Sequence, residues 1–214
     1  MSGPGRRTYA PRVPAGQRRT ELLDAALDLV VTEGHNAATM EAVAERVGVS
    51  KPVVYGIFEN RAALLGALLR REQEAALAQL AAIAPGRIDP ERPLGPQVTA
   101  VLDDVLAAAQ AAPQRWWCVV MAMPDMPAPF LVAREHARTV LHSRIERHVR
   151  AYLTGTDMAP DVVAHAVLGL VETAIRLVLT EPERYRPERI TATLLALLSP
   201  GAGAGRPSAA RTSP

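Results

Sequence analysis

The 214-residue sequence predicts an all-α fold, on three observations. Hydrophobic residues make up 49% of the chain but aromatic residues only 4%, and alanine and leucine dominate the apolar set. This composition favours helices over strands, which prefer β-branched and aromatic side chains. Apolar residues recur at helical spacing along most of the chain, and no segment has the alternation of a convincing strand. Prolines and glycines fall between the periodic segments, where helices are expected to end.

The N-terminal part predicts an arm followed by a helix. Residues 1–14 combine prolines and glycines with three arginines and have no core-forming pattern, so we expect them to be disordered without a partner. From about residue 15 to residue 33 the apolar side chains fall on one side of a helix. Gly34 follows and suits the left-handed conformation that ends many helices.

Two short helices joined by a glycine turn are predicted next. The second helix starts after Thr39, whose hydroxyl makes it a good N-cap, and it breaks at Gly48. Ser50 is the N-cap expected for a third short helix over residues 51–58. This helix, turn and helix form the supersecondary unit that can place one helix in a DNA major groove.

The remaining segments also predict helices. A long helix follows the third one and reaches about residue 83, and a proline-rich loop comes after it. The tail from residue 199 onward is of low complexity and is expected to be disordered. Further helices are predicted at about 97–111, 114–122, 130–153, 160–180 and 187–198.

Composition excludes several classes of protein. The single cysteine, Cys118, cannot form an internal disulfide, so a secreted disulfide framework is excluded. The N-terminus has no apolar stretch after its arginines and is not a signal peptide. No uninterrupted apolar run approaches the roughly 18 residues of a membrane span. We therefore expect a cytoplasmic protein with no membrane partner.

The net charge of +2 is unevenly distributed. Residues 1–20 carry five arginines and no acid, whereas residues 21–61 carry three basic side chains against seven acidic ones. Attraction for a polyanion is therefore concentrated in the N-terminal arm. An arginine-rich end can equally be a solubilising tail, so charge alone leaves both interpretations open.

The residues expected on the exposed side of the third helix suggest base reading. An alkyl side chain such as Val53 can contact a thymine methyl, and Lys51 can donate to guanine O6 and N7. Tyr55 can donate to a phosphate and fix the register. From periodicity alone, an equally valid interpretation is that these helices simply close a helical bundle.

The run MEAVAERVGVSKPVVYGIFENRAALLGALL, preceded by TELLDAALDLVVTEGHNAAT, closely resembles the N-terminal domain of the tetracycline-repressor (TetR) family. The resemblance covers about residues 15–70 and implies phosphate contacts from Thr39, Tyr55 and Arg61. It implies base-edge contacts from the start of the third helix. The full predicted DNA-binding set is Thr39, Ser50, Lys51, Pro52, Val53, Tyr55, Ile57 and Arg61.

Two departures from the family pattern change the expected contacts. Gly56 stands where the family often has a larger polar or aromatic residue, so one usual contact is missing. Arg61 replaces a common lysine, which preserves phosphate binding but changes its geometry. The arginine-rich arm resembles extensions that some members lay into an adjacent minor groove.

The resemblance also implies a domain organisation and partners. The predicted parts are a disordered arm (1–14), a helix-turn-helix DNA-binding domain (15–61), a helical ligand-binding and dimerisation domain (62–198) and a disordered tail (199–214). The implied function is a homodimeric repressor that binds a palindromic, double-stranded DNA operator and is released by an unknown small-molecule effector. The mostly apolar helix at 160–180 must be buried on most sides, in a monomer's core or across a two-fold axis.

Large soft side chains around residues 116–130 predict an adaptable apolar pocket, although they are also ordinary core residues. An anionic ligand could meet Arg138, but pairing of this arginine with Glu135 on a solvated face is the favoured interpretation. Cys118 is expected to be a small buried hydrophobe rather than a redox sensor. The predicted ligand-binding set is Trp116, Trp117, Met121, Met126, Phe130 and Arg138.

Enzymatic function is the alternative from another class. The sequence contains no H-E-x-x-H, P-loop or G-x-S-x-G motif, so we expect no enzyme activity. Three histidines spaced six apart do not converge on one helix face, so we expect neither a metal nor another cofactor. An activator or an architectural DNA-binding protein remains a further possibility.

Overall fold

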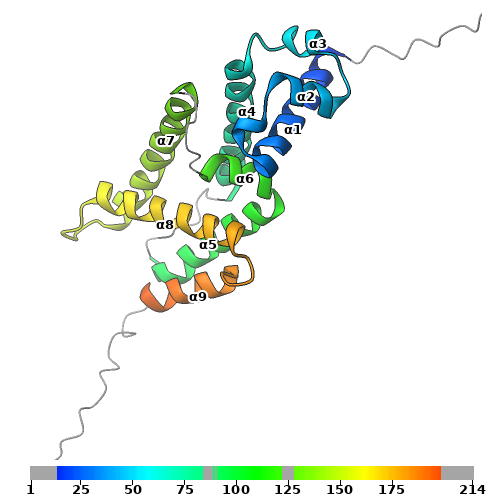
Figure 1. Cartoon of the computed structure of the whole chain (residues 1–214). Helices are drawn as coiled ribbons and strands as arrows, with labels where there is room; N and C mark the ends of the chain where they lie inside the picture. The colour runs from blue at the N-terminus through cyan, green and yellow to red at the C-terminus, as the bar shows by residue number, and fades with distance from the viewer. Residues whose placement is uncertain (1–13, 84–88, 90, 122–127, 199–214) are drawn as a thin grey trace, which may run out of the picture. The chain divides into compact units, whose positions relative to one another are not determined.

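The computed structural model describes residues 14–83, 89, 91–121 and 128–198, and every regular element in them is helical (Figure 1). The elements are α1 (Ala15–Glu33), the 3₁₀ turn η1 (His35–Ala37), α2 (Met40–Val47), α3 (Lys51–Tyr55), α4 (Arg61–Ile83), α5 (Leu94–Ala111), α6 (Pro113–Val120), α7 (Ala128–Tyr152), α8 (Pro160–Thr180) and α9 (Pro187–Leu198). The predicted all-α fold is confirmed.

Element boundaries differ from the predictions in a few places. The helix α3 ends at Tyr55 rather than at residue 58, and α5 begins at Leu94 rather than at residue 97. Pro96 is compatible with this earlier start because the first turn of a helix does not use its backbone N–H groups. The turn η1 was not predicted, since a three-residue helix has no periodicity to detect.

The chain divides into two compact units, residues 1–68 and 69–214, so the division falls inside α4. In the first unit α2 packs against both α1 and α3. Its core is aliphatic, and each of these side chains is at most 2% exposed: Leu22, Leu23, Val43, Val54, Leu64, Leu65 and Leu68. The helical pattern of apolar residues in the sequence corresponds to this buried face.

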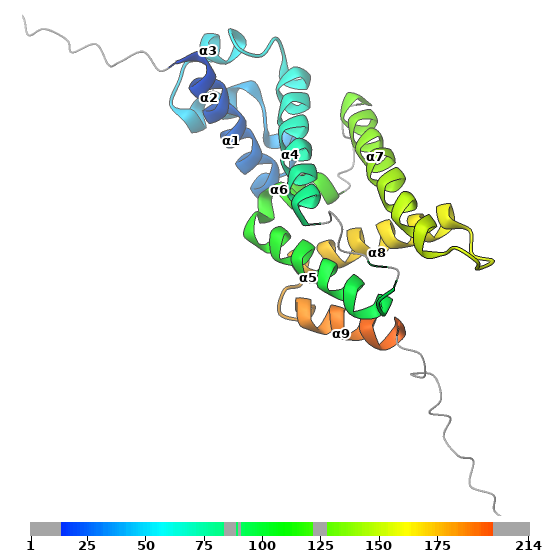
Figure 2. The same ribbon diagram turned by 180° about the vertical axis from the view of Figure 1, so that it is seen from behind.

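The core of the second unit joins α5, α6 and α8 with part of α4. Its buried members are Ala76, Leu102, Val105, Leu106, Ala109, Trp116, Val120, Ala174, Ile175 and Val178. In both views α9 lies beside α5, and α7 pairs with α8 (Figures 1 and 2). The α5–α9 contact is close at Gly95, where a Cβ atom would lie 3.2 Å from Leu195 Cδ1.

The helix α8 is long and apolar enough to cross a membrane by length and composition. Only 28% of its most apolar 18-residue window is buried within the chain. The core helix of a bundle passes the same test, so this property does not by itself indicate a membrane protein. Among the apolar residues of α8, Val162 is 63% exposed and Leu170 45% within the described part of the chain.

Candidate nucleic-acid interface

The helix α3 presents most of the predicted DNA-binding residues at the surface. Lys51, Pro52, Val53 and Tyr55 are all exposed, with Val53 39% and Tyr55 50% accessible. Between them, Val54 points inward and is fully buried. An exposed valine and tyrosine on a short helix form an apolar surface that a purely solvated helix would not favour.

The turn before α3 sets its position. Gly48 ends α2 in the left-handed conformation, with φ +72°, and its N–H donates to the carbonyls of Ala44 and Glu45. The N–H of Val49 also donates to Ala44 O, at 2.9 Å. This arrangement satisfies the last carbonyls of α2 and redirects the chain within two residues. Ser50 then occupies the N-cap position of α3, but its side chain accepts no capping hydrogen bond.

On the other side of α3, Phe58 anchors the chain to the core. Its ring is 4% exposed, and the guanidinium carbon of Arg19 in α1 lies 5.1 Å from the ring centroid. Ile57, one residue earlier, is half-buried. The predicted base contact from Ile57 would therefore use only the outer part of its side chain.

Thr39 lies at the N-terminus of α2 and caps it as predicted. Its Oγ1 accepts a hydrogen bond from the Ala42 N–H at 3.1 Å. A hydroxyl group that accepts in this way still has its own proton to donate. Half-buried Thr39 can therefore cap the helix and donate to a phosphate at the same time.

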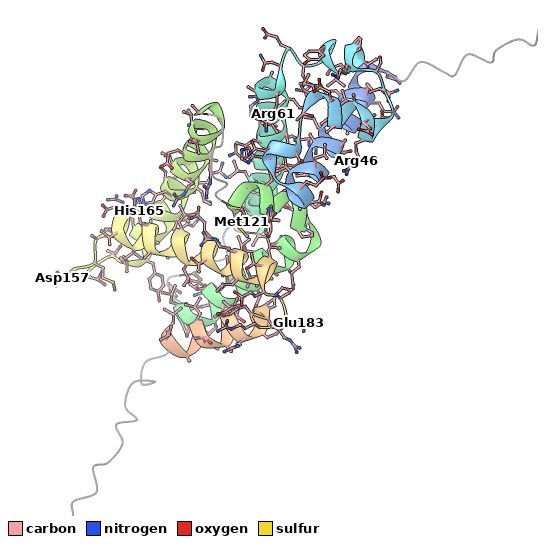
Figure 3. The ribbon with its side chains drawn as sticks, in the orientation of Figure 1. Arg46, Arg61, Met121, Asp157, His165 and Glu183 are labelled. Carbon is pink, nitrogen blue, oxygen red and sulfur yellow. The ribbon has the colours of Figure 1, made fainter. Side chains whose placement is uncertain are left out.

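Arg61 makes contacts that the sequence did not indicate. Its Nε donates to Ala38 O at 3.0 Å and its Nη2 donates to His35 O, so the side chain holds the turn before Thr39 (Figure 3). The sequence signal for these contacts is weak, because the acceptors are backbone carbonyls 23 and 26 residues away. The predicted phosphate contact would have to use the remaining N–H groups of the guanidinium.

The other basic side chains of this surface are paired with acids. Arg46 of α2 makes ion pairs with Asp28 and, at 2.9 Å, with Glu33 of α1 (Figure 3). Lys51 makes an ion pair with Glu41 of α2, and the hydrogen bond from Lys51 lowers the pKa of that carboxyl group. Asp28, Glu33 and Glu41 thus account for part of the acidic excess in residues 21–61.

The predicted ligand-binding residues in the second unit have different environments. Trp116 is 2% exposed within the core, and its Nε1 donates to Gln79 Oε1 at 3.2 Å. Trp117 and Met121 are half-buried. Met126 and the side chain of Phe130 lie outside the described part of the chain. Trp116 therefore has the contacts of a core residue with its one donor satisfied.

Arg138 of α7 pairs mainly with α8 rather than within its own helix. Its Nε lies 2.9 Å from Glu172 Oε1, whereas its Nη1 lies 4.0 Å from Glu135 Oε2. Arg134, one turn earlier, donates from Nη2 to Val120 O at 2.9 Å, while its buried Nε has no hydrogen-bond partner among the residues that the structure describes. These arginines link α7 to α8 and α6.

Cys118 is fully buried, and burial raises the pKa of its thiol to about 12. A thiol with this pKa stays protonated at physiological pH and is a poor nucleophile. Among the residues that the structure describes, no cluster of three or more His, Cys, Asp or Glu is placed to hold a metal ion.

A groove of about 450 Å³ lies between α5 and α9, away from the predicted ligand set. Polar Asp103, Gln110 and Glu188 contribute to its walls beside apolar Ala107 and Leu195. None of the residues predicted to bind ligand lines this groove.

Residues 22–68 match the family described as bacterial regulatory proteins, tetR family. The HTH-type transcriptional activator FasR of Mycolicibacterium smegmatis is 45% identical over 60 residues, which cover 28% of this chain and 27% of that protein. This chain therefore matches about a quarter of the length of that curated relative.

Solved structures extend the likeness in fold to most of the chain. A TetR-like transcriptional regulator from Rhodococcus sp. RHA1 superposes with a TM-score of 0.68 at 22% identity, over 87% of this chain and 96% of that one. A transcriptional regulator from Pseudomonas aeruginosa PAO1 gives a TM-score of 0.71 at 15% identity, over 86% and 90%.

Together, the fold and the exposed α3 define a helical protein with a helix-turn-helix DNA-binding unit at its N-terminus. The residues that match are those of the α2–turn–α3 unit and its supports in α1 and α4. The family match is carried by this N-terminal region, residues 22–68, which is similar to that of the tetR family of bacterial regulatory proteins.

Proposed function

We propose that this protein is a sequence-specific DNA-binding regulator whose α3 reads base edges in the major groove of a palindromic operator. The single observation that carries the proposal is the exposure of Lys51, Val53 and Tyr55 on one short helix whose other face is anchored by buried Val54. Lys51 and Val53 supply a donor and an alkyl group for base edges. Tyr55, Thr39 and Arg61 would contact phosphates.

The experiment compares substitutions on two DNA duplexes, one selected from a random pool by the wild-type protein and one of random sequence. Lys51→Ala should weaken binding to the selected duplex by about 1–3 kcal/mol and relax one base position. Tyr55→Phe should weaken binding to both duplexes to a similar extent, because a phosphate contact carries no sequence information. A Lys51→Ala loss that is equal on both duplexes would reassign Lys51 to a phosphate.

We propose that the protein acts as a homodimer, because a palindromic operator presents two equivalent half-sites. The uncovered apolar residues of α8 and α9 support this proposal. Val162 is 63% exposed, Leu170 45% and Leu197 77%. A second copy would cover these side chains by the same interface on both subunits.

Release from DNA by a small-molecule effector is the proposed mode of regulation, with the protein acting as a repressor. The half-buried Trp117 and Met121, and the buried Arg134 Nε that has no partner among the described residues, support a ligand site beside α6 and α7. FasR is named as an activator, and activation is the alternative sign of regulation. Transcription from the selected duplex with and without the protein distinguishes the two signs.

A further inference from the structure

The candidate base reader Lys51 is not free in the structure. Its ammonium group pairs with the carboxylate of Glu41, which lies in the first turn of α2 on the other side of the glycine turn. Lys51 is 53% exposed and Glu41 52%, so both side chains reach solvent at the surface that carries the candidate DNA contacts. The hydrogen bond from Lys51 lowers the pKa of Glu41, so the pair favours the charged form of this carboxylate.

Stability of the fold does not account for this pair. Exposed ion pairs contribute little to folding, because water screens them and two long side chains lose freedom. Glu41 also disfavours DNA binding at this surface. Its carboxylate would repel the phosphates that the neighbouring Thr39 is proposed to contact. The other ion pairs of α2 lie at its far end, where Arg46 contacts α1.

We propose that Glu41 is a specificity-determining residue, which holds the Lys51 ammonium group until the acceptors of a matching base pair replace its carboxylate. This inference rests on the proposed function of α3. On random DNA, Lys51 would have no acceptor that compensates for leaving Glu41, and the carboxylate would repel the backbone. On the matching site, guanine O6 and N7 provide two acceptors in place of the carboxylate. A group that weakens binding to the wrong sequence raises specificity, because specificity is the difference between two binding free energies.

The test replaces Glu41 by its uncharged isostere. Glu41→Gln should release Lys51 to contact phosphates, so binding to a random-sequence duplex should tighten. One additional phosphate contact steepens the slope of the logarithm of the association constant against the logarithm of salt concentration by about 0.9. Between 50 and 200 mM salt, the variant should therefore lose about threefold more affinity than the wild-type protein. Affinity for the selected duplex should change less, and the ratio of the two affinities should fall severalfold.

Two matched variants isolate the pair. Glu45→Gln removes the same charge from an exposed position one turn further along α2 and should leave the affinity ratio unchanged. In the double variant Lys51→Ala/Glu41→Gln, the additional salt dependence should disappear, because no lysine remains to be released. Thermal unfolding of all variants checks that the first unit stays folded.

The role of Glu41 would be overturned if affinity for random DNA also rose in Lys51→Ala/Glu41→Gln, or if Glu45→Gln raised it as much as Glu41→Gln does. Either result would leave the proposed reading of DNA bases by α3 intact. A wild-type protein that enriches no sequence from the random pool would overturn the proposed function itself. In that case the salt slopes on random DNA still show whether Glu41 restrains Lys51.

Discussion

Arg61 illustrates how one side chain can serve both the fold and DNA binding. The resemblance to the TetR family implies a phosphate contact at this position, and the structure adds two hydrogen bonds from its guanidinium to His35 O and Ala38 O. Those carbonyls belong to the turn that leads into Thr39. Of the five N–H groups of an arginine, some remain for a phosphate. Arg61 thus positions the turn before Thr39, a proposed phosphate contact, in addition to making its own proposed one.

Substituting Arg61 should separate these two roles. Arg61→Lys keeps the positive charge but cannot donate in a rigid fork to two carbonyls. We expect it to lower the free energy of unfolding by about 1–3 kcal/mol, because half-buried acceptors lose their partners. Arg61→Ala should do the same and also reduce the salt slope of DNA binding by about 1.

Thermal or denaturant unfolding and salt-dependent binding measure these effects. Arg70→Lys, at an exposed position on the same helix, is the control and should leave both quantities unchanged. Should Arg61→Lys unfold like the wild-type protein, the hydrogen bonds to the turn contribute nothing to stability.

The helix α8 was predicted to be buried on most sides, either in a monomer's core or across a two-fold axis. In the structure two of its polar side chains face α7: the ring centroids of His165 and His142 lie 3.9 Å apart, and Glu172 pairs with Arg138. Apolar Val162 and Leu170 are exposed instead. The described part of a single chain therefore leaves these two positions of α8 uncovered, and their burial across a two-fold axis stays a prediction.

The proposed dimer makes a prediction about the exposed face of α8 and α9. Leu170→Glu and Leu197→Glu should each shift the protein from dimer to monomer, because an isologous interface would bury the introduced charge twice. The same substitutions should weaken binding to a two-half-site duplex by at least about tenfold, since simultaneous binding of two linked recognition helices is lost. Sedimentation and DNA titration measure the two effects.

The control for this experiment is Leu131→Glu, at a 52% exposed position on α7, which should change neither assembly nor binding. A wild-type protein that stays monomeric at micromolar concentration, or α8 and α9 variants that remain dimeric, would contradict the proposed interface.

At the scale of the whole molecule, α4 is the element shared by the two units. Its first residues, from Arg61 to Leu68, belong to the unit with α3, and those from Leu69 onward belong to the unit with the predicted ligand residues. Buried Glu72 of α4 pairs with Arg115 of α6 at 3.1 Å, beside Trp116. A ligand that changes the contacts of α6 would act directly on α4.

This shared helix leads to a prediction of reciprocal coupling. A compound found by its thermal stabilisation of the protein should weaken binding to the selected duplex, and the duplex should weaken binding of the compound by the same factor. A coupling of about 1–3 kcal/mol corresponds to a change of roughly 5- to 150-fold. Calorimetric titration of each partner with and without the other measures both factors. A compound that contacts Trp117 or Met121 and leaves DNA affinity unchanged would refute release by that compound.

The sequence alone determined the helical class, the approximate positions of the α-helices and the exposure of Lys51, Val53 and Tyr55 on α3. Local rules govern these features: apolar periodicity places Val54 and Phe58 inward, and glycine at position 48 ends α2. Within the described residues, tertiary structure decided which partners the charged side chains take. Glu41 with Lys51, Arg61 with the turn after α1 and Glu172 with Arg138 join residues 10 or more positions apart. Periodicity carries no information about such pairs, because they depend on how separate helices pack.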